Sequence, residues 1–310
     1  MFHVNAWGLP YAATLAGSIL VLPGPVMDPA SLADQMSRHR VTFTAGVPAI
    51  WRGLLPFASR VDLSSLRTVV SGGSALPEAL GRAWYDATGV RITGSWGMTE
   101  TSPLVVCSRI ATAHDGLGPD AQARVLGTPG PPVPLADLRL VDDEGHLVDH
   151  DGTTPGELQV AGPTIASGYF GAVPGTAPFT DDGWLRTGDV ATIDQYGYVR
   201  IVDRTKDLVK SGGEWMSSVT LENEIMAHPD IVEAAIIGVA DDRWGERPVA
   251  CLVTVPGRDV DETALRDHLA GRVASWWIPE RLWILPAIPK TATGKFNKVA
   301  LREQFAADHR

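Results

Sequence analysis

Five short segments combine glycine with hydroxyl, carboxylate or ammonium side chains, which are the groups that bind phosphates and sugars. The last of them reads PKTATGKFNK and places Lys295 directly after a glycine. It is not a P-loop, because Pro289 stands where the first glycine of a P-loop belongs and Phe296 replaces the Ser or Thr that follows the lysine. The segment therefore offers a flexible cation in a different setting.

Two segments lie in the first part of the chain. The first, SGGS at 71–74, separates an expected strand from an expected helix, so its backbone can approach a ligand, although a tight turn explains it equally. The second, GSWGMTETS at 94–102, offers Trp96 for stacking on a base, Thr99 for a phosphate and Glu100 for magnesium. A strand end with a buried tryptophan and a helix-capping threonine is the alternative interpretation.

The remaining two segments lie further along the chain. GWLRTGD ends in Asp189, which is suited to accept hydrogen bonds from ribose hydroxyls, and an Asx-type turn is the alternative. DRTKDLVKSGGEW runs from Asp203 to Trp215, with alternating charges followed by a Gly-Gly pair. A solvated linker also has this composition.

Alternating helices and strands must position the early segments. Asp28 and Pro29 mark the start of a helix that extends to about Arg38, and a second helix runs from Pro77 to a C-terminal Gly89. Strands are expected at 41–45, 66–70 and 90–93, after a short apolar run at 18–22. This alternation predicts a parallel sheet with right-handed crossovers over residues 1–121.

The pattern changes along the rest of the chain. Residues 122–202 contain short β segments separated by turn clusters, including 137–141, 157–160 and 198–202, and predict a β-rich subdomain. Residues 203–310 predict a small α+β domain with helices at 219–227 and from Asp261, and strands at 231–239, 249–255 and 281–285. We therefore expect a partial α/β N-terminal domain at 1–202, followed by a C-terminal domain.

Composition excludes several functions. The net charge of -10 argues against a nucleic-acid-binding protein, and no apolar run approaches the ~20 residues that span a bilayer. The N-terminus has no signal-peptide pattern, and two isolated cysteines predict neither a disulfide nor a zinc site, so a cytoplasmic location is expected. No lysine occurs in the first 205 residues, and the lysines are Lys206, Lys210, Lys290, Lys295 and Lys298, whereas arginines occur throughout.

The order and spacing of the five segments resemble the AMP-forming acyl-CoA synthetases, which belong to the adenylate-forming enzymes. GSWGMTETSP resembles the adenine and magnesium motif, and GWLRTGD resembles the ribose-binding motif. DRTKDLVKSGGEW resembles the hinge and thioesterification loop, and PKTATGK resembles the segment of the catalytic lysine. SGGEW, together with MFHVNAWG at the start, is most similar to the medium- and long-chain fatty acid branch.

The resemblance implies an acid-CoA ligase that uses ATP, Mg²⁺ and CoA to convert a fatty acid to acyl-AMP and then to acyl-CoA. It also implies a mobile C-terminal domain. A peripheral association of the protein with the membrane and a homodimeric state are further expectations. Lys295 would bridge the carboxylate and the α-phosphate, Thr99 and Glu100 would complete the catalytic set, and Glu100 would bind magnesium. The implied nucleotide-binding residues are Gly72, Gly73, Ser74, Ser95, Trp96, Gly97, Asp189 and Arg204. Asp203 would be the hinge, and the thioesterification residues would be Lys210, Ser211, Gly212, Gly213, Glu214 and Trp215.

One family motif does not occur in this sequence. The family has a Ser/Thr/Gly-rich loop followed by Pro-Lys-Gly, which should precede MFHV, and the only similar stretch, 151–156, has no lysine after it and is expected to be a turn. The sequence therefore indicates an N-terminally truncated member with an exposed sheet edge. Two alternatives follow: a catalytically impaired remnant that binds a nucleotide or acyl ligand, and an adenylating enzyme that passes the acyl group to a carrier protein.

Overall fold

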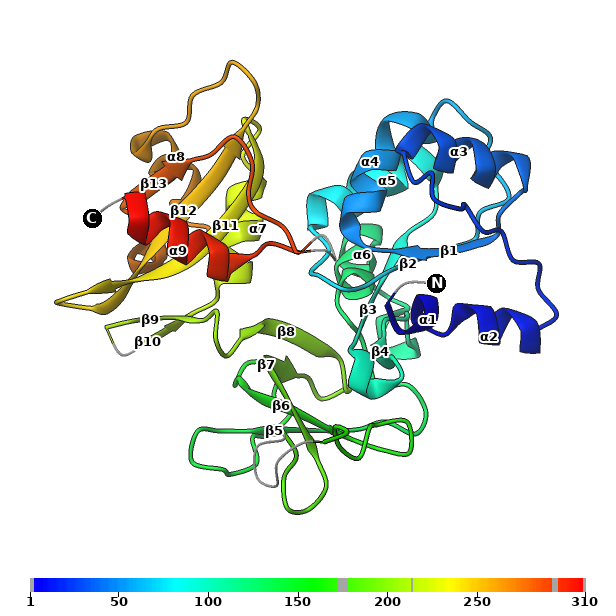
Figure 1. Cartoon of the computed structure of the whole chain (residues 1–310), viewed down its shortest axis with the longest axis horizontal. Helices are drawn as coiled ribbons and strands as arrows, with labels where there is room; N and C mark the ends of the chain where they lie inside the picture. The colour runs from blue at the N-terminus through cyan, green and yellow to red at the C-terminus, as the bar shows by residue number, and fades with distance from the viewer. Residues whose placement is uncertain (1–2, 172–177, 213, 292–294, 309–310) are drawn as a thin grey trace. The chain divides into compact units, whose positions relative to one another are not determined.

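The computed structural model describes residues 3–171, 178–212, 214–291 and 295–308. The chain divides into two compact units, and Figure 1 shows the elements of each. Unit 1 comprises Met1–Thr187 and Ala191–Ile201, and unit 2 comprises Gly188–Val190 and Val202–Arg310. Among the described residues, no helix is long and apolar enough to cross a membrane.

Unit 1 begins with a sheet in the order β1-β2-β3-β4. Strands β1 (Phe43–Gly46), β2 (Thr68–Ser71) and β3 (Ile92–Gly97) are parallel, as the alternating pattern predicts, and β4 (Leu104–Cys107) is antiparallel to β3. In Figure 1, three of the helices lie together above β1 and β2: α3 (Pro29–Arg38), α4 (Pro48–Ala58) and α5 (Glu78–Thr88). The other helices of this part are α1 (His3–Trp7), α2 (Leu9–Leu15) and α6 (Pro119–Gly127).

Local capping signals fix two of these helices where the sequence predicts them. The Asp28 carboxylate accepts a hydrogen bond from the Ser31 N–H at the start of α3, and Gly89 ends α5 with a φ of 71°. Trp51 of α4 and Trp84 of α5 are fully buried, with their ring centroids 5.7 Å apart. Aromatic packing therefore joins the helices that cover this face of the sheet.

Apolar side chains are exposed on β1 and on the segment that precedes α3. Within the described residues, β1 is the end strand, and its Phe43 is 46% exposed. The apolar run at 18–22 forms no strand, and its Ile19 is 93% exposed.

A second, β-rich sheet follows with the order β5-β6-β7-β8. Its strands are β5 (Asp137–Val141), β6 (Gly156–Ala161), β7 (Leu185–Ile193) and β8 (Val199–Arg204). Its core contains the fully buried Leu140, Leu158 and Leu185. The stretch at 151–156 precedes β6 as a turn, in which the Asp151 carboxylate accepts the Thr153 and Thr154 N–H groups.

Unit 2 is an α+β domain whose sheet has the order β10-β9-β12-β11, with β13 beside β12. The strands are β9 (Val209–Ser211), β10 (Glu214–Met216), β11 (Ile231–Asp241), β12 (Gly245–Thr254) and β13 (Arg281–Ile284). The helices are α7 (Ser218–Met226), α8 (Glu262–Leu269) and α9 (Lys298–Asp308), and short 3₁₀ turns occur in both units at Thr99–Thr101, Thr112–His114 and Ser275–Trp277.

Alternate residues of β11 build two hydrophobic cores in unit 2. Ile236 packs in the core that contains residues of α7 and α8, whereas Ile237 packs in the core that contains Leu301 and Phe305 of α9. Because successive side chains of a strand point to opposite faces, the helices cover both faces of this sheet. The start of α9, where Lys298 lies, is thereby held close to the sheet.

Candidate functional site

The glycine loop after β2 is packed against the end of β3. Gly72 is buried, and a Cβ atom at this position would lie 2.8 Å from the Ser95 Oγ. The same hydroxyl donates a hydrogen bond of 3.1 Å to the Ser71 carbonyl. Gly73 has a φ of 81°, which favours glycine, and Ser74 is exposed. The structure therefore brings Gly72 and Ser95 together, as a binding loop would require.

The end of β3 is held by close backbone contact. A Cβ atom at Gly97 would lie 1.8 Å from the Pro103 carbonyl oxygen, so only glycine fits there. Trp96 is partly buried and packs against the core of the β-rich sheet. The 3₁₀ turn that follows is capped by the Thr101 hydroxyl, which accepts from the Met98 N–H, whereas Thr99 is exposed. The capping threonine is thus Thr101, and Thr99 is free to face a ligand.

Tyr169 orients the carboxylate of Glu100. Its phenol donates a hydrogen bond of 2.5 Å to the Glu100 Oε1. This hydrogen bond is the main reason why the pKa of Tyr169 is raised to about 12, and burial is the next largest cause. The Ala166 N–H also donates to the Glu100 carbonyl, at 2.7 Å. Within the described residues, no group of three or more His, Cys, Asp or Glu side chains could hold a metal ion. A metal ion at Glu100 would therefore take its further ligands from bound substrate and water.

Two predicted residues of unit 2 form an ion pair. The Arg204 Nε lies 3.1 Å from the Asp189 Oδ1, where the Asp189 carboxylate is buried and the Arg204 side chain is about half exposed. The Thr205 N–H donates to the Gly188 carbonyl at 3.0 Å, which ties β7 to the end of β8. The structure therefore joins the carboxylate and the guanidinium that the sequence predicts to act together.

Lys295 lies at the base of a closed loop in unit 2. The Thr291 N–H donates to the Lys295 carbonyl at 2.8 Å, and the Asn297 N–H donates to the Pro289 carbonyl at 2.8 Å. Residues 292–294 of the PKTATGK segment lie outside the described part of the chain. In the part that is described, the Lys295 ammonium makes no ion pair, so it remains available to an anionic ligand.

The surroundings of Lys295 disfavour its charge. Its side chain keeps solvent exposure, yet the protein atoms around the ammonium desolvate it and lower its pKa. The charges of Arg204 and Lys206 lower the pKa further, while Asp189 raises it. Lys295 therefore lies within electrostatic range of both members of the Asp189–Arg204 pair.

The predicted hinge and thioesterification residues follow in unit 2. Asp203 is 2% exposed, and its carboxylate accepts the Ser218 N–H at 2.5 Å. Lys210 of β9 lies opposite Trp215 of β10, with its ammonium 5.0 Å from the indole centroid. Gly212 adopts a φ of 63° at the end of β9. Gly213 and the side chain of Glu214 lie outside the described part of the chain.

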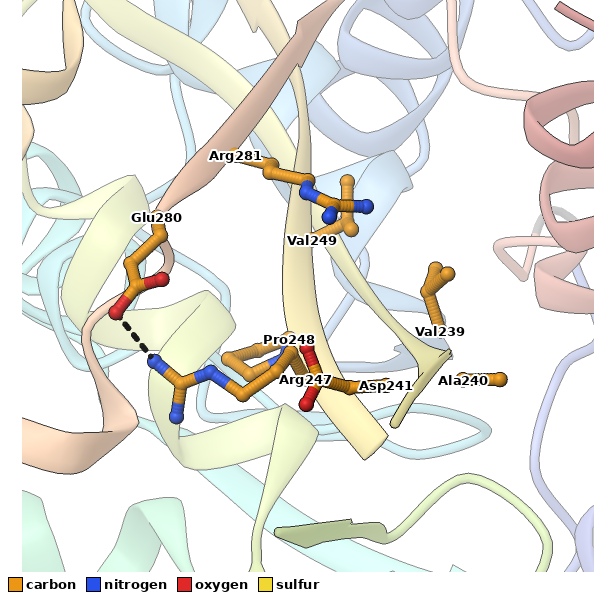
Figure 2. A pocket seen from close by; sticks show the side chains of 8 residues that line it. All are labelled: Val239, Ala240, Asp241, Arg247, Pro248, Val249, Glu280 and Arg281. Carbon is orange, nitrogen blue, oxygen red and sulfur yellow. Dashed lines mark hydrogen bonds and ion pairs between the residues drawn. The ribbon is translucent and has the colours of Figure 1, made fainter. Parts of the chain in front are cut away.

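A small pocket near this hairpin has a charged lining that sequence reasoning missed. Figure 2 shows the side chain of Arg247 directed toward Glu280. The Glu280 carboxylate lies 3.0 Å from the Arg247 Nη2. The Arg247 Nη1 also donates to the Trp276 carbonyl at 3.1 Å and to the Ser211 Oγ at 3.4 Å. The lining residues are Val239, Ala240, Asp241, Arg247, Pro248, Val249, Glu280 and Arg281. Arg247 thus ties this pocket to one predicted residue, Ser211.

Comparison with known proteins decides the family. A family model described as AMP-binding enzyme matches residues 1–170, and a model described as AMP-binding enzyme C-terminal domain matches residues 220–295. The chain belongs to the AMP-binding enzyme family. This membership confirms the resemblance that the five segments indicate.

Curated relatives of this AMP-binding enzyme include several CoA ligases. It is 45% identical to the long-chain-fatty-acid–CoA ligase of Thermus thermophilus, over 98% of this chain and 57% of the relative. It is 44% identical to the 3-methylmercaptopropionyl-CoA ligase of Ruegeria pomeroyi, over 98% of this chain and 57% of the relative. It is 41% identical to the medium-chain-fatty-acid–CoA ligase of Ectopseudomonas oleovorans, with 98% and 56% covered. The chain thus spans little more than half the length of these relatives.

Solved structures of similar proteins share the fold. ATP-bound MatB from Rhodopseudomonas palustris matches with a TM-score of 0.84 and 32% identity, over 98% of this AMP-binding enzyme and 58% of MatB. The anthranilate CoA ligase AuaEII in complex with anthranoyl-AMP matches with a TM-score of 0.79 and 32% identity, over 94% and 55% of the two chains. These likenesses confirm the predicted fold class.

Proposed function

We propose that this AMP-binding enzyme takes part in the two-step activation of a fatty acid to its CoA thioester. In the first step a carboxylate oxygen attacks the α-phosphorus of ATP, which forms acyl-AMP and releases pyrophosphate. In the second step the CoA thiolate attacks the acyl carbon, which forms acyl-CoA and releases AMP. The Lys295 ammonium, which makes no ion pair with the residues that the structure describes, lies in the same unit as the Asp189–Arg204 pair, and this observation best supports the proposal.

Lys295 would act in the first step. Bringing a carboxylate to a phosphate places two anions together, and a flexible cation with no competing ion pair reduces their repulsion and orients them. Asp189 and Arg204 would bind the ribose, because a buried carboxylate held by a guanidinium is a fixed acceptor for two hydroxyls. The charges of both residues also influence the pKa of Lys295, so the ribose and the ammonium would lie near one another.

Residues of unit 1 would bind the rest of the nucleotide. Trp96 would face adenine, Thr99 would contact phosphate, and Gly72, Gly73, Ser74, Ser95 and Gly97 would line the site. Glu100 fits a magnesium ion that arrives with ATP, because Mg²⁺ is commonly held by one or two carboxylates together with substrate phosphates. Such an ion would neutralise charge on the phosphates, and Tyr169 would orient the carboxylate that holds it.

The second step would use the residues between β8 and β10. Asp203 would be the hinge about which the C-terminal domain, residues 203–310, turns relative to residues 1–202. Lys210, Ser211, Gly212, Gly213, Glu214 and Trp215 would then border the path of the CoA thiol. The exposed Trp215, with Lys210 over its ring, offers an apolar surface next to a positive charge.

The acid would be a medium- or long-chain fatty acid. The names of two relatives, the long-chain and the medium-chain ligases, support this substrate class. A third relative is named for 3-methylmercaptopropionate, so short thioether acids belong in the test.

The test measures thioester formation by the 310-residue chain with ATP, Mg²⁺ and CoA. The acids are a series from butanoate to palmitate, with 3-methylmercaptopropionate alongside. We expect acyl-CoA product that Lys295→Ala abolishes and that the exposed α9 variant Glu303→Gln retains. Absence of product from protein with a cooperative unfolding transition would overturn the proposal for this chain.

Binding without turnover is the second candidate. The 310 residues contain no Ser/Thr/Gly-rich loop followed by Pro-Lys-Gly, and they span 57% of the first relative. Calorimetric titration with a non-hydrolysable acyl-adenylate analogue would detect such binding. Comparing free CoA with a phosphopantetheinylated carrier protein as acceptors would separate the ligase from a carrier-loading enzyme.

A further inference from the structure

The two lysines that flank Lys295 are both used in ion pairs. The Lys290 Nζ lies 2.5 Å from the Glu233 Oε1, and the Lys298 Nζ lies 2.7 Å from the Glu222 Oε1. Lys295 makes no such pair among the described residues. The PKTATGKFNK segment therefore has a free cation between two cations that are bound to the body of unit 2.

The Lys298–Glu222 pair is the more buried of the two. The side chains of Lys298 and Glu222 are 10% and 9% exposed, whereas Lys290 is 42% exposed. Glu222 also accepts the Ile236 N–H at 2.8 Å, from the edge strand β11. Burial raises the pKa of Glu222, and the Lys298 charge opposes that rise. Apolar residues often stabilise a fold as well as such a buried pair does, so a role in fixing geometry deserves a test.

The Lys298 ammonium is linked to Asp203 through one intermediate residue, Ser218. Lys298 donates a hydrogen bond to the Ser218 Oγ. Ser218 is fully buried at the start of α7, and its N–H donates to the Asp203 Oδ2 at 2.5 Å. Lys298 begins α9 only three residues after Lys295. A continuous set of contacts therefore runs from the start of α9 to Asp203.

We propose that Lys298, paired with Glu222, is a positioning residue that holds the Lys295 loop in a fixed place relative to Asp203. This inference rests on the proposed function, because Lys295 is the group that is positioned. Lys298 itself does not touch the substrate. It fixes the C-terminal arm of the loop, and Lys290 with Glu233 fixes the N-terminal arm. The Lys295 ammonium can then be presented to an anion with little loss of conformational freedom.

The first test needs no activity and reads two amide protons of the loop. The Thr291 and Asn297 N–H groups close the loop, so their hydrogen exchange reports on its order. We expect Lys298→Met to speed their exchange by about 10-fold or more while the Leu265 N–H of α8 exchanges as before. Glu222→Gln should act in the same direction, and Glu303→Gln on the exposed side of α9 should have no effect.

Two outcomes of the exchange experiment would overturn the proposal. In one, Thr291 and Asn297 keep their exchange rates in a folded Lys298→Met protein. In the other, exchange rises equally throughout unit 2, which would make Lys298 a general stabilising residue. Lys298→Arg keeps the positive charge and should restore part of the protection from exchange. This variant therefore distinguishes the effect of the ion pair from the effect of side-chain volume.

The second test uses acyl-adenylate formation. Lys298→Met should lower kcat for this step by up to about 100-fold with little change in the KM for ATP, since a misplaced catalytic group costs rate. In a Lys295→Ala background, Lys298→Met should cost nothing more, because the group that it positions is already absent. Independent, multiplicative losses would contradict the proposal. If the unaltered chain forms no adenylate, the proposed function fails for this chain, and the exchange result still decides the role of Lys298.

Discussion

Lys295 differs from an ordinary surface lysine in the charges that surround its ammonium. Desolvation, Arg204 and Lys206 lower its pKa, and Asp189 opposes them. A lysine that acts as a cation loses its function as the pH rises through its pKa. The charge of Lys295 is therefore lost at a lower pH than that of a free lysine, and its neighbours set where this happens.

Removing the charge of Lys206 should extend the pH range of Lys295. Lys206→Met takes away a positive neighbour, so the pKa of Lys295 rises, whereas Asp189→Asn takes away a negative neighbour and lowers it. The measurement is the pH dependence of Lys295 modification by an amine-selective reagent, followed by peptide mass spectrometry. Lys210→Met is the matched control. Shifts in the reverse directions would contradict the electrostatic explanation.

Tyr169 should tune the metal affinity of Glu100. Tyr169→Phe deletes the phenol that donates to the Glu100 carboxylate, and the loss of such an orienting partner weakens metal binding by about 10-fold. The measurement is the Mg²⁺ concentration that gives half-maximal ATP binding. The exposed Tyr196→Phe serves as control. An unchanged Mg²⁺ requirement in Tyr169→Phe would mean that the hydrogen bond does not position the carboxylate for metal.

At the scale of elements, the β2 loop depends on its contact with β3. A methyl group at Gly72 would lie 2.8 Å from the Ser95 Oγ, so one of the two must move. We expect Gly72→Ala to destabilise the protein by about 1–3 kcal/mol, and Ser95→Ala in the same chain to recover part of that loss. Urea unfolding of the single and double variants measures both effects.

A glycine without such a contact provides the comparison. At Gly81, inside α5, an added Cβ would lie 3.8 Å from the nearest side-chain atom, in Leu76. Gly81→Ala should therefore stabilise the helix by about 0.4–1 kcal/mol. If Gly72→Ala behaved in the same way, the close contact with Ser95 would not constrain the loop.

Sequence reasoning succeeded where the signal is local. Asp28 and Gly89 mark helix ends through hydrogen bonds and dihedral angles within a few residues, so α3 and α5 were predictable. The sequence did not reveal α4, because Pro48 and Pro56 both suggest interruption, although Pro48 begins the helix and Pro56 lies within its last turn. Strand ends were displaced by a few residues, since pairing partners rather than composition decide them.

The site residues divide in the same way. Lys295, Asp189 and Arg204 lie in segments with recognisable spacing, and the structure brings the last two together. Tyr169 lies 69 residues from Glu100 in the chain, and Lys298 lies 76 from Glu222, by subtraction of their numbers. Such pairs form only when the fold assembles, so the sequence did not reveal them.

At the scale of the whole molecule, each unit has its own hydrophobic cores. The described members of each core cluster all belong to one unit: Leu158 lies in a core of unit 1 and Ile236 in a core of unit 2. We therefore expect each unit to unfold independently of the other.

Core truncations should separate two unfolding transitions. Leu158→Ala and Ile236→Ala each remove a fully buried side chain and should cost about 2–5 kcal/mol. We expect calorimetry to show that each variant lowers the midpoint of a different transition. A single transition that both variants shift equally would show that the two units unfold as one.

The division of β7 between the units limits how relatives of this protein can be recombined. Gly188–Val190 belongs to unit 2, although the residues on both sides of it belong to unit 1. A chimera joined at residue 201 would combine Asp189 from one parent with Arg204 and Lys295 from the other. A chimera that exchanges the C-terminal part should therefore also transfer Gly188–Val190 of β7. Alternatively, it should combine parents that have the same residues at these positions.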